Sequence, residues 1–155
     1  MSLKDTIQED LKAALLAGDR FTGDTLRNIK AAILNEEVAS GKRDEGLSDE
    51  EIEKLIAREI KKRKESIALY ESNGRPELAE DEQKEADVLA KYLPEQLGED
   101  EIDKVVKEKI TALGVGGPSA MGQVIGAVKQ QLGNSADGAL IAKIVKQNLD
   151  QGGAK

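Results

Sequence analysis

Apolar residues recur at helical spacing along the whole chain, and this pattern limits the possible folds more than any other feature of the sequence. It is clearest where Ile52, Leu55, Ile56 and Ile60 follow the motif Ser48-Asp-Glu-Glu51. Serine followed three residues later by glutamate is a capping box, and acidic side chains in a first turn suit the positive end of the helix dipole. No segment alternates between apolar and polar residues as a half-buried strand does, so the sequence predicts an all-α protein.

The spacing predicts about seven helices in two helical subdomains. The first subdomain, residues 1–94, holds four helices, including a long spine helix over about 48–73. That helix is about 38 Å long at about 1.5 Å per residue. Pro94 is expected to end the first subdomain, because proline cannot continue a helix. The second subdomain, residues 95–150, holds three shorter helices, and residues 151–155 are expected to fray.

Capping residues, glycines and prolines predict where individual helices begin. The second helix is expected to start at about Thr22 or Asp24, with Leu26, Ile29, Ile33 and Val38 on its apolar stripe. The fourth helix is expected to run to Leu93. Pro118 suits the first helical position of the sixth helix, and Ser135 or Asp137 is expected to cap the seventh.

The chain contains no cysteine and no histidine. This excludes disulfides, thiolate nucleophiles, histidine general bases and Cys/His zinc sites. A magnesium site made of carboxylates stays possible, but there is no phosphate-binding loop that ends in Gly-Lys-Ser/Thr. Most acidic residues fall in first turns or on helix surfaces, which favours capping over catalysis. We therefore expect no catalytic residue, no metal site and no cofactor.

No apolar run approaches the roughly 20 residues that span a membrane. The first residues, Met1-Ser-Leu-Lys-Asp5, lack the basic and apolar regions of a signal peptide. The sequence thus predicts a cytoplasmic protein without a membrane partner.

The net charge of −7 is unevenly distributed. Residues 1–94 contain 16 basic and 22 acidic side chains, a net charge of −6, whereas residues 114–155 contain four lysines and two aspartates, a net charge of +2. An acidic chain is not a general nucleic-acid binder, because phosphate affinity requires clustered Lys and Arg. A local basic face could still contact RNA. With only Phe21, Tyr70 and Tyr92 as aromatic residues, folded RNA is a better target than single strands.

A basic run lies on the predicted spine helix, with acidic residues between its members. It could contact phosphates, or it could be a solvated face with ion pairs four residues apart, such as Lys61 with Glu65. Both interpretations are open. The run consists of Arg58, Lys61, Lys62, Arg63 and Lys64, with Glu59 and Glu65 between them.

Glycines mark a second candidate surface in the C-terminal part. The loop Gly114-Val-Gly-Gly-Pro-Ser119 offers backbone N–H groups of residues such as Gly117 and Ser119 for a phosphate, whereas Asp137 would compete with an anion at the next helix start. Gly122 and Gly126 lie one turn apart inside a helical pattern, where each costs about 1 kcal/mol relative to alanine. They predict a close approach, either by the last helix or by a partner.

Three lysines extend this surface. Lys129 lies one turn beyond Gly126, and Lys143 and Lys146 lie one turn apart on the last helix. The glycine ridge and these lysines could together form a small positive surface.

An ordered set of motifs runs the length of the chain: Leu26-Arg-Asn-Ile-Lys-Ala-Ala-Ile33, Leu47-Ser-Asp-Glu-Glu-Ile52, Glu59-Ile-Lys-Lys-Arg-Lys-Glu-Ser-Ile67, Gly74-Arg-Pro-Glu-Leu78, Tyr92-Leu-Pro-Glu-Gln-Leu97, Met121-Gly-Gln-Val-Ile-Gly126 and Ala136-Asp-Gly138. Together these motifs closely resemble the YqeY family. The resemblance implies a cytoplasmic bacterial protein with two helical subdomains. It also implies that the C-terminal half is similar to the tail domain of the B subunit of the tRNA-dependent Asp/Glu amidotransferase.

In that enzyme the tail engages the body of the tRNA, while ATP-dependent activation and glutamine hydrolysis belong to other domains. Family members are described by association as having carbon–nitrogen ligase activity with glutamine as amido-N-donor. This chain has no counterpart of those catalytic domains. The tail pattern Met-Gly-x-x-x-Gly and Ala-Asp-Gly falls on Met121, Gly122, Gly126 and Ala136 to Gly138, while Gln123 and Ala139 occupy positions that are often lysine in such tails.

Three hypotheses follow. The first is a non-catalytic tRNA-interacting protein that uses the face formed by Gly117, Ser119, Gly122, Gly126, Lys129, Lys143 and Lys146. The second is an adaptor in translation, whose acidic residues 1–94 dock a basic protein partner. The third takes the amidotransferase activity literally.

Overall fold

The computed structural model describes residues 1–153. Within them the chain forms seven α-helices and two short 3₁₀ turns, and it has no β-strand. The expected all-α fold is confirmed. The chain divides into two compact units, of which the first is Met1–Leu93 and the second begins at Pro94.

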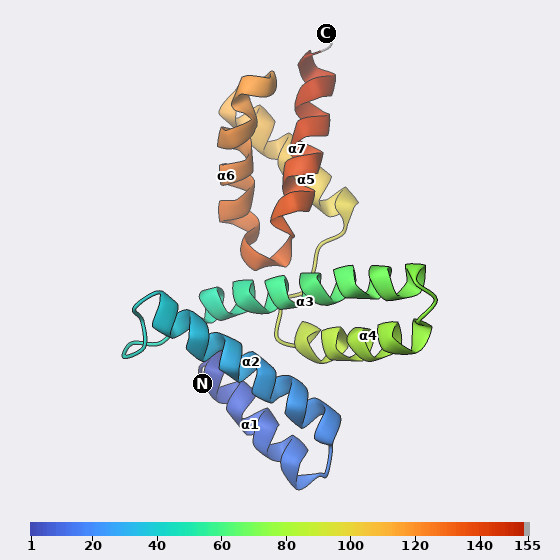
Figure 1. Ribbon diagram of the computed structural model, residues 1–155. Coiled ribbons are helices and arrows are strands. Elements are labelled where there is room, and N and C mark those ends of the chain that lie inside the picture. Colours follow the sequence, from blue (N-terminus) through green and yellow to red (C-terminus); the bar gives the residue numbers. More distant parts are fainter. Residues whose placement is uncertain (154–155) are drawn as a thin grey trace. The chain divides into compact units, whose positions relative to one another are not determined.

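The first unit contains two helical hairpins (Figure 1). One hairpin pairs the first two helices, and the other pairs α3, the longest helix, with the fourth. The helices are α1 (Leu3–Leu16), α2 (Arg20–Ala39), α3 (Asp49–Ser72) and α4 (Pro76–Ala90).

All four helices contribute to one apolar core in this unit. Ile7 of α1, Leu26 of α2, Ile52 and Ile56 of α3 and Leu89 of α4 are fully buried. Each such side chain contributes about 1.5–3 kcal/mol through removal from water. The core therefore holds both hairpins of the unit together.

Two helix ends in this unit differ from the sequence prediction. Helix α2 begins at Arg20, before Thr22, because the carboxylate of Asp19 accepts a hydrogen bond from the N–H of Thr22 at 3.1 Å and caps the helix. Helix α4 ends at Ala90 and not at Leu93. The N–H of Leu93 bonds to the carbonyl of Ala90 in a tight turn, since the residue before a proline avoids the helical conformation.

The second unit contains three helices, with α6 and α7 lying side by side (Figure 1). Pro118 begins a 3₁₀ turn and not the first turn of the sixth helix, and the seventh helix continues past residue 150. Residues 154–155, part of the terminus expected to fray, lie outside the described residues. The elements are α5 (Glu99–Leu113), the turn Pro118–Ala120, α6 (Met121–Leu132), the turn Gly133–Ser135 and α7 (Gly138–Gly153).

A second core lies between these three helices. Ile102 and Val106 of α5, Val124 and Val128 of α6 and Ile141 of α7 are fully buried. Their burial requires the opposite sides of α6 and α7 to face solvent. This arrangement positions the candidate site.

Candidate functional site

Gly122 and Gly126 lie on the exposed side of α6. If a Cβ atom is built onto either glycine, no heavy atom lies within 4 Å of it apart from the helix's own nearby backbone. Of the two approaches that the sequence predicts for these glycines, close packing against the last helix does not occur. The buried side chains of Val124 and Val128 make that contact, and the glycines project away from it.

Lys129 lies one turn beyond Gly126 and is exposed. Its side chain reaches the start of α7, because a Cβ atom built onto Gly138 would lie 3.4 Å from both Cε and Nζ of Lys129. The two helices run in opposite directions (Figure 1). The ammonium group of Lys129 therefore lies over the turn that joins them.

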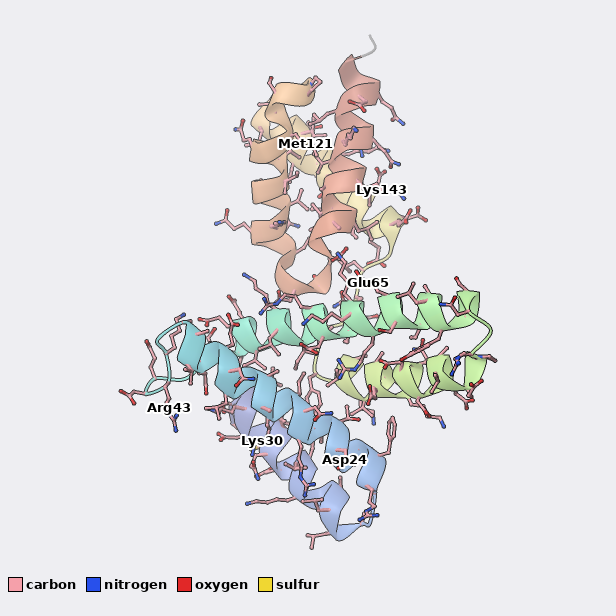
Figure 2. All side chains as sticks on the ribbon, in the orientation of Figure 1. Asp24, Lys30, Arg43, Glu65, Met121 and Lys143 are labelled. Carbon is pink, nitrogen blue, oxygen red and sulfur yellow. The ribbon has the colours of Figure 1, made fainter. Side chains whose placement is uncertain are left out.

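Lys143 and Lys146 lie on the exposed side of α7, where Figure 2 shows Lys143 projecting into solvent. Together with Ala139 they repeat the spacing i, i+4, i+7 that Gly122, Gly126 and Lys129 have on α6, so each set forms one stripe. Lys146 is eight residues beyond Gly138, about 12 Å along the axis, which brings it level with the start of α6. The structure thus leaves two glycines of α6 and three lysines of α6 and α7 exposed, and we call the exposed sides of this helical hairpin the α6–α7 face.

None of these three lysines forms an ion pair with any residue that the structure describes. The carboxylate of Asp103 on α5 has partners of its own. Asp103 accepts hydrogen bonds from Asn148 Nδ2 at 2.7 Å and Lys107 Nζ at 2.8 Å, and these bonds, the one from Asn148 first, lower the pKa of Asp103. No ion pair therefore neutralises the lysines of the α6–α7 face within the described residues.

Asp137 is the cap of α7. Its Oδ2 accepts a hydrogen bond from the N–H of Leu140 at 3.2 Å, whereas the hydroxyl of Ser135, the other expected cap, donates to the carbonyl of Leu132. As expected, the carboxylate of Asp137 occupies the position that an anion would take at this helix start.

Gly117 and Ser119 precede α6 and are joined to it by the 3₁₀ turn. Gly117 has φ of +79°, a conformation that favours glycine, and Ser119 is exposed. Both residues lie at the end of α6 that is opposite Lys129, about 12 Å away along the helix. They extend the α6–α7 face at the level of Lys146.

The basic run on α3 is largely paired. Arg63 contacts the carboxylates of Glu59 at 3.1 Å and Glu85 at 3.2 Å, and Lys62 contacts Glu59 at 3.4 Å. The expected pair between Lys61 and Glu65 does not form within the described residues. Glu59 is the common partner because it lies three and four residues before Lys62 and Arg63. These contacts favour a solvated, paired face over a phosphate site.

One buried charged residue is missing from the sequence prediction. Glu37 is 2% exposed, while Val38, the residue expected on the apolar stripe, is 56% exposed. Glu37 contacts Lys4 Nζ at 2.9 Å and accepts the N–H of Leu47 at 3.0 Å; the bond from Lys4 is the main reason why its pKa is lowered. The spacing of four residues from Ile33 is the only sequence signal for this position.

Within residues 1–153, no group of three or more acidic residues is placed to hold a metal ion. In the same part of the chain, no helix has the length and apolar character that crossing a membrane requires.

Known proteins are similar in sequence to this chain over most of its length. The family model described as "Yqey-like protein" matches residues 4–149. A relative named "Altered inheritance of mitochondria protein 41, mitochondrial" from Pyrenophora tritici-repentis is 33% identical over 146 residues, which cover 91% of this chain and 77% of the relative.

Proteins of the same name occur in two other organisms. The relative from Clavispora lusitaniae is 32% identical over 110 residues, and the one from Saccharomyces cerevisiae strain S288c is 35% identical over 111 residues. These matches cover 71% and 69% of this chain, but only 61% and 58% of the relatives. The chain therefore spans about three-fifths of the length of these two proteins.

The names of these relatives overturn one prediction. All three are called mitochondrial, so the expectation of a cytoplasmic protein is wrong. That expectation depended on the lack of a secretory leader, a feature that cannot distinguish the cytoplasm from the inside of an organelle. Because the family model matches nearly the whole sequence, this chain belongs to the family of Yqey-like proteins.

Proposed function

We propose that this protein is a non-catalytic tRNA-interacting helical protein, related to the tail domain of the amidotransferase B subunit. The α6–α7 face is the proposed contact surface. One observation carries the proposal: Gly122 and Gly126 stand open to solvent beside three exposed lysines without ion pairs in the described residues.

The two open glycines lower the stability of the helix, and no neighbouring element in the described structure needs them. Each glycine inside a helix costs about 1 kcal/mol relative to alanine, and here neither makes room for a neighbouring element. A bare backbone lets a bulky ligand come closer than any side chain would allow. A sugar–phosphate backbone is such a ligand, and it also attracts the ammonium groups of Lys129, Lys143 and Lys146.

The residue types of the face suit folded RNA better than single strands. Helical RNA is recognised through phosphates and 2′-hydroxyl groups across a wide, shallow groove, without the aromatic stacking that single strands require. The face supplies cations and the hydroxyl of Ser119, and it contains no aromatic residue. Few cations are present, so we expect weak binding that depends strongly on salt.

The test is a titration of fluorescently labelled folded tRNA with the whole chain, at about 50 mM and about 200 mM salt. We expect affinity to fall as salt rises. The variant Lys129→Glu/Lys143→Glu is expected to bind at least about tenfold more weakly and to reduce the salt slope by about two, since each lost phosphate contact lowers the slope by about one.

The matched control is Lys54→Glu/Lys104→Glu, which makes the same change in net charge with exposed lysines of α3 and α5. It is expected to bind like the wild type. The variant Gln123→Lys/Ala139→Lys adds positive charge at two exposed positions and is expected to bind more tightly. Equal losses in both glutamate variants, or binding that ignores salt, would refute the proposal.

The amidotransferase hypothesis is tested separately. The purified chain is incubated with glutamine, ATP and a mischarged tRNA, and the formation of amidated aminoacyl-tRNA is measured. Since the contact surface proposed here contains no cysteine and no histidine, we expect no product. Turnover by the chain alone would replace the binding proposal with an enzymatic one.

A further inference from the structure

The turn between α3 and α4 contains the only Asn–Gly pair of the chain, Asn73-Gly74. Asparagine is chemically labile, because the backbone nitrogen of the next residue can attack its side-chain amide. Glycine in the next position favours this attack, since it has no Cβ to shield its nitrogen and its backbone turns freely. The pair therefore places an electrophile and a nucleophile in adjacent residues.

Solvent reaches both residues of the pair. Asn73 and Gly74 are exposed, and a Cβ atom built onto Gly74 would have no heavy atom within 4 Å apart from its chain neighbours. Water, which deamidation consumes, therefore has access to the turn. The small succinimide ring that forms during the reaction also has space there.

Local hydrogen bonds hold the pair at the end of α3. Nδ2 of Asn73 donates to the carbonyl of Leu69 at 2.8 Å, and the N–H of Gly74 donates to the carbonyl of Glu71 at 3.3 Å. The second bond is longer than an ordinary N–H···O bond, and neither bond involves another helix. Both break when the last turn of α3 frays, and fraying of a helix end needs little free energy. The amide and the nitrogen are then free to react.

We propose that Asn73 is a site of covalent modification by water, where deamidation gives aspartate and isoaspartate. The nitrogen of Gly74 loses its proton and bonds to Cγ of Asn73. The Cγ–Nδ2 bond breaks, and Nδ2 takes up a proton and leaves as ammonia. Water then opens the succinimide ring. Cleavage between the nitrogen and Cγ gives aspartate, and cleavage between the nitrogen and the carbonyl carbon of Asn73 gives isoaspartate.

Either product removes the side-chain bond that closes α3. A carboxylate cannot donate to the carbonyl of Leu69, and its negative charge lies at the negative end of the helix dipole. Isoaspartate also adds a carbon atom to the main chain, inside the turn where the N–H of Arg75 donates to the carbonyl of Tyr70 at 2.8 Å. Modification of Asn73 thus loosens the hairpin of α3 and α4.

The other asparagines are less favourable for this reaction. Asn134 is half-buried and is followed by Ser135, whose side chain crowds the backbone nitrogen. The remaining asparagines lie inside helices, and each is followed by a residue larger than serine. They are Asn28, Asn35 and Asn148.

The only Asp–Gly pair, Asp137-Gly138, could form the same ring. Its carboxylate accepts the N–H of Leu140 at 3.2 Å, and its negative charge repels the attacking nitrogen. No ammonia is released from an aspartate, so reaction at Asp137 leaves the mass of the chain unchanged. Mass spectrometry therefore distinguishes the two pairs.

The experiment incubates the whole chain in mildly alkaline buffer, in which the nitrogen of Gly74 loses its proton more readily. Peptide mass spectrometry follows the gain of about 1 Da when an amide becomes an acid, with samples taken before incubation as the baseline. Isoaspartate is measured in the separated peptides with protein isoaspartate methyltransferase and labelled S-adenosylmethionine. Asn73 is expected to react at least about tenfold faster than Asn134 and to give isoaspartate, because glycine leaves its nitrogen unshielded.

Two variants test the site and its consequence. Asn73→Gln keeps an amide at the end of α3 but must close a larger ring, so the gain in mass of this peptide is expected to disappear. Asn73→Asp reproduces one product and is expected to lose hydrogen-exchange protection in the last turn of α3. Asn35→Asp is the matched control, because it makes the same change in charge at an exposed position of α2. It is expected to leave the protection of α3 unchanged.

Four results would overturn this proposal. Asn73 keeps its amide throughout the incubation, Asn134 reacts as fast as Asn73, or the gain in mass appears without isoaspartate. In the fourth, Asn35→Asp reduces the protection of α3 as much as Asn73→Asp does. None of these measurements involves RNA, so their outcome is independent of the proposed tRNA contact.

Discussion

Glu37 illustrates how a single charged residue can belong to a core. Burying a carboxylate costs several kcal/mol unless it is paired and hydrogen-bonded. Here Lys4 supplies the charge from α1, and the N–H of Leu47 supplies a second bond from the segment before α3. Glu37 thus ties three parts of the first unit together, a role that Val38 could not perform.

The variant Glu37→Gln is expected to destabilise the first unit by about 1.5–3 kcal/mol at pH 7, because a bond between charged groups is lost. Since the pKa of Glu37 is lower in the folded state, its stabilisation is present above the ordinary value near 4.5 and is lost as pH falls through the lower folded value. Urea unfolding at pH 7 and below pH 4.5 measures this, and we expect the variant and wild type to converge at acidic pH.

Glu36→Gln is the matched control for that experiment. Glu36 is the preceding residue and contacts Arg58 at 4.0 Å on the surface. Exposed ion pairs contribute about 0–1 kcal/mol, so this change is expected to have a small effect at both pH values. A loss as large as that of Glu37→Gln would show that burial of Glu37 is not the cause.

The sequence predicts Leu26, Ile29 and Ile33 as core residues of α2 correctly, but it cannot choose between Glu37 and Val38. An apolar side chain is the default for a core position, so Val38 is the natural choice. The choice reverses only because Lys4, far away in the sequence, reaches Glu37. Such tertiary compensation is invisible to a local pattern.

At the scale of the element, α6 is a helix whose two sides serve different purposes. Its buried stripe packs in the second core, and its glycine side stands open. Helical periodicity predicts the helix and the stripe. It does not predict what lies opposite Gly122 and Gly126, because the same spacing suits close packing and open solvent equally well.

Replacing these glycines by alanine distinguishes a closely packed position from one that is open to solvent. Gly122→Ala and Gly126→Ala are each expected to stabilise the second unit, by up to about 1 kcal/mol, because alanine is the better helix former and its methyl group meets no neighbour. The same changes are expected to weaken tRNA binding if a backbone approaches the ridge. Thermal unfolding and the tRNA titration are measured on the same samples.

Gly23 provides the contrast for this pair of changes. A Cβ atom built there would lie 3.3 Å from Leu15, so Gly23→Ala is expected to bring less stabilisation than either change on α6. Destabilisation by Gly122→Ala would contradict the open ridge.

Capping signals predict helix ends well only where the cap is local. Ser2 and Ser48 cap α1 and α3 as their sequences indicate, each accepting an N–H three residues on. The sequence prediction places the start of α2 too late. Asp19, its cap, directly follows Gly18 of the preceding turn, so it looks like a loop residue in the sequence. Leu93 lies beyond the end of α4 because Pro94 acts on the residues before it.

At the scale of the whole molecule, the chain has two separate cores. All buried apolar residues of the first cluster lie in helices α1 to α4 or in the adjoining segment at Leu47, and those of the second lie beyond Pro94. Each core could therefore sustain its own unit. Destabilising variants in one core measure how strongly the unfolding of the two units is coupled.

A cavity in one core is expected to act mainly on its own unit. Ile141→Ala removes a fully buried side chain and is expected to cost about 2–5 kcal/mol, with faster amide hydrogen exchange in α5, α6 and α7. Ile29→Ala is the counterpart in the first unit and is expected to affect α1 to α4. Faster exchange across the whole chain in both variants would instead show one cooperative unit.

The fold class and the family follow from the sequence, because helical periodicity and ordered motifs are distributed over the whole chain. The location does not follow, because the features of a secretory leader cannot distinguish the cytoplasm from the inside of an organelle. The glycines and lysines of the α6–α7 face can be identified in the sequence as a candidate surface, because each set repeats at helical spacing. A pocket between α1 and α2 cannot be identified in this way, because its lining residues come from two helices.

The contact between Lys129 and Gly138 has a consequence for protein engineering. A methyl group at residue 138 would lie 3.4 Å from Cε and Nζ of Lys129, so it would already be in van der Waals contact with that side chain, and larger residues there would displace the ammonium group. A series of increasingly large residues at position 138 would therefore move the Lys129 ammonium group step by step across the surface, while all three lysines are retained.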